Sequence, residues 1–209
     1  MRRHFLMRVV LAESVLILMA GTASTALAAG SAPDEAFQRQ VFGRTIDKDR
    51  IHACYRRAYD APHLGSHPQQ NVRTMTLLVT GSAGEGADPG YTLGLGVTFR
   101  KAGTHFETFG GCGAIGSSAA PAAKATIAHC SVDCDGGAID VRLKNEKSVL
   151  VAIPDGARIW KAGSDSEDSD ERKRFGADDK LFRLDRTALT DCLSLVGDED
   201  EKAMLRRGQ

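Results

Sequence analysis

Apolar and polar residues alternate along residues 91–100, and this alternation is the feature that most limits the fold. Tyr91, Leu93, Leu95, Val97 and Phe99 occupy every second position, and Thr, Gly or Arg stands at the positions that follow them. Successive side chains of a strand point to opposite faces, so the segment is predicted to be a strand with one buried face. An amphipathic helix would instead need apolar residues three or four positions apart.

The same period of two recurs along the chain and defines the predicted fold class. The predicted strands lie at residues 75–79, 91–100, 139–143, 149–153, 158–161 and 181–184. Residues 51–60 fit either a strand or a helical turn, and short helices are predicted at 35–42 and 189–196. Short strands between turn signals, such as Pro154-Asp155-Gly156, indicate an antiparallel structure. We therefore predict a mainly β fold, an antiparallel barrel or sandwich of about eight strands with short terminal helices.

The first 28 residues have the form of an export signal peptide. A basic start precedes a mostly apolar stretch over 9–20, and Ala26-Leu27-Ala28 has the small-x-small form that signal peptidase accepts. We predict cleavage after Ala28. The alternative is a retained anchor over 9–29, which Glu13 disfavours because an acidic residue near the centre of a spanning helix costs about 2–3 kcal/mol. Arg2-Arg3-His4-Phe5-Leu6 also resembles a twin-arginine signal, although the general secretory route is favoured.

Cleavage would leave residues 29–209 as a single disulfide-stapled β domain that is periplasmic or secreted. This part holds 24 basic and 26 acidic residues, so its charge gives no reason to expect nucleic acid or an anionic membrane as partner. No stable membrane insertion is expected after cleavage. Two further segments are predicted to be solvated: a charged loop at 164–180 and a polar tail at 197–209.

All five cysteines follow the export signal: Cys54, Cys112, Cys130, Cys134 and Cys192. In an oxidising compartment they are expected to form disulfides rather than catalytic or zinc sites. On a strand Cys130 and Cys134 would lie about 13 Å apart, too far to bond each other. Cys112–Cys130 is the natural pair across neighbouring strands, whereas Cys54 and Cys192 could bond each other or Cys134. Because five is odd, one thiol is left over.

Histidines supply the alternative of a metal site. His63 and His67 are four residues apart, and His129 precedes a cysteine, so these three are the candidate ligands. Pro62 and Pro68 flank the first two, and a Gly lies between them, so a helix that would bring them together is not expected. We therefore predict no metal and no other cofactor.

Enzyme motifs are missing from the sequence. It has no Gly-x-Ser-x-Gly nucleophile elbow and no Gly-x4-Gly-Lys-Ser/Thr phosphate loop. A Cys/His nucleophile would have to combine Cys112 or Cys134 with His129, and a structural disulfide is the favoured role for these cysteines.

Several short motifs resemble a pattern in small exported bacterial proteins of unassigned function. They are Cys54-Tyr55-Arg56-Arg57-Ala58-Tyr59-Asp60, His63-Leu64, His67-Pro68-x-Gln70-x-Val72, Cys130-x3-Cys134-Asp135-Gly136-Gly137, and Phe182-Arg183-Leu184-Asp185 before Cys192. The resemblance covers most of the chain after the export signal and implies no activity.

The leading hypothesis is a non-enzymatic binding or interaction module of the cell envelope. An empty barrel interior would indicate a small apolar ligand, and a filled interior would indicate a partner such as an envelope protein. The side chains that decide are Leu93, Val97, Val141 and Val151. The alternatives are a metal-dependent or Cys/His-based periplasmic enzyme, and a structural protein without a ligand.

Overall fold

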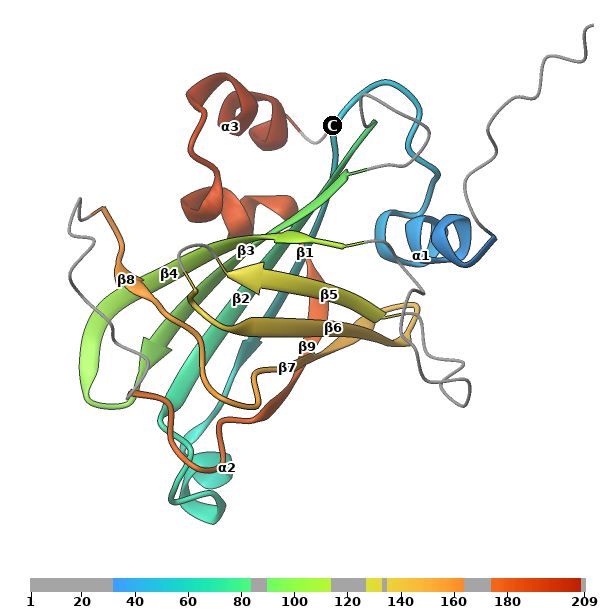
Figure 1. Ribbon diagram of the computed structural model, residues 1–209. Helices are drawn as coiled ribbons and strands as arrows, with labels where there is room; N and C mark the ends of the chain where they lie inside the picture. The colour runs from blue at the N-terminus through green and yellow to red at the C-terminus, as the bar shows by residue number, and fades with distance from the viewer. Residues whose placement is uncertain (1–31, 84–89, 114–126, 133–134, 164–173, 208–209) are drawn as a thin grey trace, which may run out of the picture.

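The computed structural model describes residues 32–83, 90–113, 127–132, 135–163 and 174–207 (Figure 1). The export signal lies outside these residues. In chain order the elements are α1 (Ala32–Phe42), β1 (Ile51–Ala58), α2 (Ala61–Ser66), β2 (Val72–Ser82), β3 (Gly90–Phe99), β4 (Ala102–Cys112), β5 (Ile127–Val132), β6 (Ala138–Asn145), β7 (Ser148–Ala152), β8 (Trp160–Lys161), β9 (Leu181–Thr187), the 3-10 helix η2 (Leu189–Leu195) and α3 (Glu199–Arg206). None of the described helices is long and apolar enough to cross a bilayer.

Eight antiparallel strands close into a barrel. Strands β1 to β6 each pair with the next strand in sequence, and β9 pairs with both β7 and β1, which closes the ring. The short strand β8 adds to β4 outside the ring. The mainly β prediction is confirmed, and the barrel is the form it takes.

Strand alternation fills the barrel interior with side chains. Leu93, Val97, Val141 and Val151 are at most 3% exposed and belong to one continuous cluster of buried side chains, together with Phe182. An interior packed in this way is a core.

The structure resolves one ambiguous segment and differs from the prediction at two others. The ambiguous residues 51–60 contain strand β1, which is paired with β2 and β9. The predicted strand at 158–161 is reduced to the two residues of β8. The predicted polar tail contains helix α3, because Asp198 caps its start by accepting from the Glu201 N–H at 2.7 Å and Leu205 is buried beneath it.

Helix α1 closes one end of the barrel. Its Phe37 and Val41 are fully buried, and the Phe37 ring lies 5.3 Å from that of Tyr91. The Tyr91 hydroxyl donates to Asp34 at 2.7 Å. Burial raises the pKa of Tyr91, and the hydrogen bond to Asp34 raises it further. Asp34 lies within α1, which begins at Ala32.

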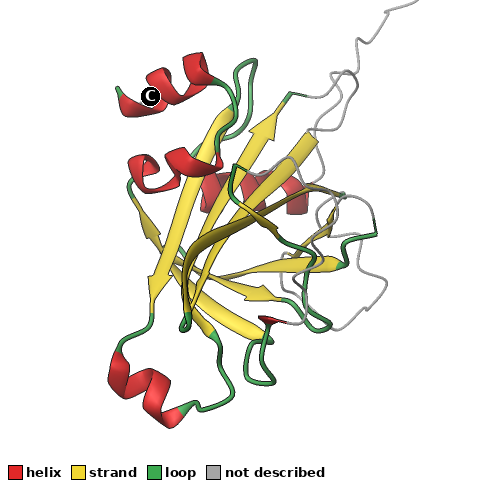
Figure 2. Ribbon diagram, turned by 90° about the vertical axis from the view of Figure 1, so that its left-hand side faces the viewer, coloured by secondary structure: helices red, strands yellow, loops and turns green. Residues whose placement is uncertain are grey.

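Helices η2 and α3 form a layer on the outside of β1, β2 and β3, and α2 lies beyond the opposite end of these strands (Figure 2). The layer is joined to β1 by the Cys54–Cys192 disulfide and rests on a small apolar cluster that includes Leu78 and Leu195. Gly96 of β3 makes room for it, because a Cβ there would lie 2.7 Å from His105 Cε1 and 3.3 Å from Leu195 Cδ2.

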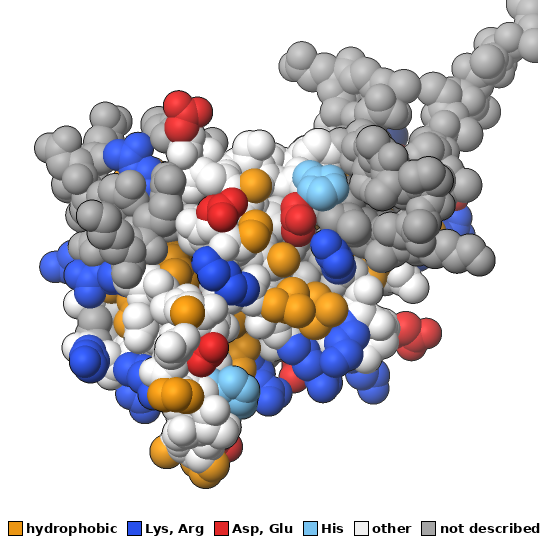
Figure 3. All heavy atoms as spheres, turned by 60° about the horizontal axis from the view of Figure 1, so that its bottom comes forward, with side chains coloured by type: hydrophobic (Ala, Val, Ile, Leu, Met, Phe, Trp, Pro, Cys, Tyr) orange, Lys and Arg blue, Asp and Glu red, His pale blue; other side chains and the backbone are white. Residues whose placement is uncertain are grey.

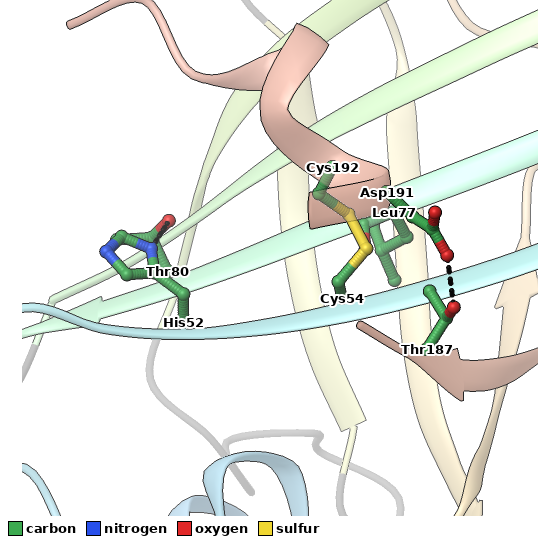
Figure 4. Close-up of a disulfide and its surroundings, with 7 residues drawn as sticks. All are labelled: His52, Cys54, Leu77, Thr80, Thr187, Asp191 and Cys192. Carbon is green, nitrogen blue, oxygen red and sulfur yellow. Dashed lines mark hydrogen bonds between the residues drawn. A yellow bond between two sulfur atoms is a disulfide. The ribbon is translucent and has the colours of Figure 1, made fainter. Parts of the chain in front are cut away.

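A polar contact also joins this layer to the barrel. His52 Nε2 lies 3.2 Å from Glu201 Oε1 of α3, and His52 Nδ1 lies 3.1 Å from the Thr80 hydroxyl. Figure 4 shows His52 and Thr80 beside the disulfide. Burial lowers the pKa of His52, and the charge of Glu201 partly opposes this.

Candidate ligand-binding site at the α2 end

The structure forms a helix at the predicted histidine pair. The expectation that prolines would prevent it was wrong, because Pro62 lies in the first turn of α2, where its missing N–H breaks no helical bond. Asp60 caps this turn by accepting from the His63 N–H at 2.9 Å. His63 and His67 are thereby brought together.

Their rings stack rather than converge on a common point. The ring centroids of His63 and His67 are 4.2 Å apart, and their planes are 18° apart. The Tyr59 ring also stacks on His63, with the two ring centroids 4.6 Å apart. A metal ion lies in the plane of each imidazole that binds it, so two nearly parallel rings do not share an ion in this arrangement. One nitrogen of each ring is also engaged: His63 Nε2 with Gln70 Oε1 at 3.0 Å, and His67 Nδ1 with the His63 carbonyl at 2.9 Å.

The third candidate ligand lies elsewhere. His129 is on β5, where its Nδ1 is 2.6 Å from Asp140 Oδ1. Within the described ranges no three His, Cys, Asp or Glu side chains are grouped as metal ligands. The absence of a cofactor stays a prediction.

Four of the five cysteines form two disulfides. Cys112 and Cys130 face each other across β4 and β5 with an S–S distance of 2.03 Å, as predicted for neighbouring strands. Cys54 and Cys192 bond at 1.99 Å, which decides between the alternatives left open for them. Cys112 is therefore not available as a nucleophile for His129. Cys134 lies outside the described residues.

Carboxylates at the α2 end hold the backbone together. Fully buried Asp179 accepts from the N–H groups of Asn71 and Gly176, both at 2.8 Å, and of Val72 at 3.2 Å. Burial raises the pKa of Asp179, while these amide bonds favour its charged form. Asp178 accepts from the Gln69 N–H at 3.1 Å. Residues 174–180 of the predicted charged loop are thus packed against the start of β2, and residues 164–173 lie outside the described part.

Two arginines line a hollow beside this framework without an ion pair among the described residues. Arg56 of β1 and Arg73 of β2 are both exposed, and the hollow has a volume of about 540 Å³. The Thr74 and Thr98 hydroxyls, which hydrogen-bond each other, also line it. The remaining lining residues are Ala58, Tyr59, Asp60, Phe99 and Gly103. Guanidinium and hydroxyl groups around one hollow are suited to binding an anion.

Tyr59 contributes a surface rather than a base. Burial raises the pKa of Tyr59 to about 12, so its hydroxyl stays protonated at neutral pH. The Arg57 guanidinium lies 5.7 Å from the centre of its ring and pairs with Asp185 at 3.1 Å. Tyr59, Arg57 and Asp185 all belong to the resemblance motifs, and the fold brings the two motif segments together although they are more than 100 residues apart.

A larger hollow on the barrel wall is a weaker candidate for an anion. It measures about 690 Å³ and lies beside β7 and β9. Its Arg183 is paired with Asp185 at 2.9 Å, and its Arg186 donates to the Val41 carbonyl and lies over the Tyr55 ring. A hydrogen bond from Ser148, with help from Arg183, lowers the pKa of Asp185, so these cations already face a stable negative charge.

No motif in the sequence points directly to the arginine hollow. Arg56 shares the outer face of β1 with Cys54, but its cross-strand neighbours are Thr76 of β2 and Asp185 of β9, and the pairing register sets these contacts. A net charge near zero also gives no indication of where basic and acidic side chains gather on the surface. Figure 3 looks toward the α2 end and shows Lys and Arg side chains spread over that surface.

Comparisons of the chain with protein-family models, curated proteins and solved structures return no match. The resemblance to small exported bacterial proteins therefore stays a prediction, and the geometry of the α2 end is what supports a function.

Proposed function

We propose that the protein is an exported, non-enzymatic binding module of the cell envelope that recognises an anionic ligand at the α2 end of its barrel. The observation that supports this most is the 540 Å³ hollow, in which Arg56 and Arg73 have no ion-pair partner among the described residues. Asp60, the acidic side chain in its lining, is engaged as the cap of α2. The two guanidinium groups are thus left to bind an external charge.

The size and position of the hollow fit a small ligand or a terminal group of a larger one. Its volume lies within the range of about 300–1,000 Å³ usual for small-molecule sites. The packed barrel core supports an external site over an internal apolar one. Two disulfides fit a periplasmic or secreted location, where such a module would meet envelope components.

The test is an NMR titration of the oxidised mature protein with citrate as the anionic probe. We expect saturable shifts at residues 56, 73, 74 and 98. Arg56→Gln and Arg73→Gln should each weaken binding about ten-fold, since a charge-assisted hydrogen bond contributes about 1.5–3 kcal/mol. Arg142→Gln is the matched control, because Arg142 is an exposed arginine on the outer face of β6.

Two outcomes would contradict the proposal. Shifts that rise linearly with citrate and never saturate would mean that no site exists. Equal weakening by Arg142→Gln would mean that the response follows total charge rather than the hollow.

A further inference from the structure

A second, smaller hollow adjoins the first, and both have Phe99 in their lining. Its volume is about 200 Å³, and its lining residues are Asn71, Phe99, Arg100, Lys101 and Arg174. Among these described residues three are cationic and none carries a carboxylate. This distinguishes it from the first hollow, which includes Asp60, and from the hollow beside β7, which includes Glu146 and Asp185.

Arg100 is fixed in place by backbone oxygens. Its guanidinium donates to the carbonyls of Leu64 at 2.7 Å and His67 at 2.5 Å, and its backbone N–H donates to the Asn71 carbonyl at 2.9 Å. Its Nε is buried and has no acceptor in the described part of the chain. Carbonyl oxygens orient a guanidinium but do not neutralise it, so Arg100 keeps a full positive charge at the edge of the hollow.

One carboxylate lies near this charge. Asp179 interacts electrostatically with Arg100, but the two side chains form no ion pair in the described part of the chain, and the Asp179 oxygens accept from three backbone amides. No ion pair is described for Arg100 or Lys101 within the described ranges. Lys101 is exposed at the turn between β3 and β4, so its ammonium can reach a bound ion without rearrangement of the fold.

Arg174 approaches from a different segment. Its guanidinium lies 4.6 Å from the centre of the Phe106 ring, and its carbonyl accepts from Asn71 Nδ2 at 2.8 Å. The backbone of Arg174 is thereby held to the same edge of the barrel as Arg100. Cationic side chains from two separate parts of the chain thus line one small hollow.

We infer that this hollow binds a tetrahedral oxyanion, a phosphate or sulfate group, and that the ligand of the α2 end carries such a group; the second part rests on the proposed function. One guanidinium satisfies a planar carboxylate through two parallel bonds. The two positive charges and the several N–H donors of Arg100 and Lys101 suit an ion with more acceptor oxygens and a charge near −2. The small volume fits one such group rather than a whole ligand.

The test compares four probes by NMR on the oxidised mature protein: inorganic phosphate, sulfate, acetate and chloride at equal ionic strength. Saturable shifts at Lys101 and at the Arg100 Nε–H with phosphate and sulfate, but not with acetate or chloride, are the expected result. Lys101→Gln should weaken phosphate binding about five-fold, because it removes one exposed charged donor. Lys144→Gln, an exposed lysine of β6, should change nothing. Equal responses to all four probes, or equal weakening by both variants, would overturn the inference.

A vesicle arm identifies the source of the group. Co-sedimentation with phosphatidylglycerol vesicles that is lost in Lys101→Gln and retained in Lys144→Gln would assign it to a lipid headgroup. Binding of inorganic phosphate without vesicle binding would assign it to a soluble ligand. Citrate binding that depends on Arg56, with no preference for phosphate over acetate, would sink this inference and leave the proposed function standing. Phosphate binding at Arg100 without citrate binding would do the reverse.

Discussion

Two parts of the molecule lie outside the barrel core and are held to it by different forces. The η2–α3 layer is attached by the Cys54–Cys192 disulfide and an apolar cluster under Leu195. The α2 end is attached by carboxylates that accept from backbone amides, with Asp179 at their centre. The disulfide and the apolar side chains of the first attachment are buried, whereas cationic side chains stay exposed at the surface of the second.

The difference separates stability from binding. In the η2–α3 layer, the described cysteine Cys192 is buried and bonded to Cys54 of β1. At the α2 end the acidic side chains accept hydrogen bonds from backbone N–H groups. Arg56, Arg73 and Lys101 have no ion-pair partner among the described residues. Changes in the layer should therefore alter the free energy of unfolding, and changes to these cations should alter binding alone.

Removal of the layer's disulfide is expected to have the largest effect. The chain-entropy relation gives about 4–5 kcal/mol for Cys54→Ala with Cys192→Ala, because the bond closes a sequence separation of 138. Cys112→Ala with Cys130→Ala, across a separation of 18, should cost about 3 kcal/mol. Urea unfolding of both double variants measures the two costs. A larger cost for the second pair would show that loop length does not set the order.

At the α2 end, Asp179→Asn should cost about 2 kcal/mol, since it replaces a charged, buried acceptor of three backbone amides by a neutral one. Hydrogen exchange should speed up at Asn71, Val72 and Gly176 and stay slow in η2. Faster exchange throughout the barrel would mean that the two parts are not independent.

Gly96→Ala tests the fit of the layer on the sheet. The new Cβ would press on His105 and Leu195, and overpacking of this kind costs about 1–2 kcal/mol. Gly111→Ala is the matched control on β4, where nothing lies within 4 Å of the added Cβ. The comparison fails if the two variants unfold at the same urea concentration.

The smallest expected effect is a pH dependence of the layer. Burial lowers the pKa of His52 below 6.5, so below that pH the unfolded chain binds more protons than the native one. The contribution of His52 to the free energy of unfolding is therefore fully present above pH 6.5. It is lost as the pH falls toward the lowered pKa of His52 in the folded protein. His52→Gln should flatten the stability profile in this range, and exposed His67→Gln should leave it unchanged. An unchanged profile in His52→Gln would assign the dependence to other groups.

Local periodicity was enough to predict the mainly β fold and several of its strands, while a barrel and a sandwich both stayed open. The predicted strand at 91–100 is β3 (Gly90–Phe99), with Leu95 opposite Leu77 of β2, and the Cys112–Cys130 pair followed from neighbouring strands. The short helices were harder to predict. Pro62 led to the prediction that no helix forms here, because a proline inside a helix is destabilising. At the first turn it is tolerated, and the cap at Asp60 places Pro62 in that turn.

The α2 end was the part that sequence reasoning missed. Asp179 lies in a segment predicted to be a solvated loop, yet it is fully buried because the start of β2 offers it unpaired N–H groups. Arg56 and Arg73 become neighbours of one hollow only through the β1–β2 register. Such contacts depend on long-range pairing, which a single sequence does not encode locally.

The bond between Cys54 and Cys192 also changes what a protease can do to this molecule. The two cysteines lie on β1 and η2, near the two ends of the folded chain. A single cut at any peptide bond between them yields two fragments that stay joined through sulfur. A nicked copy would therefore migrate as one species on a non-reducing gel and separate only after reduction, so limited proteolysis would not by itself release a fragment.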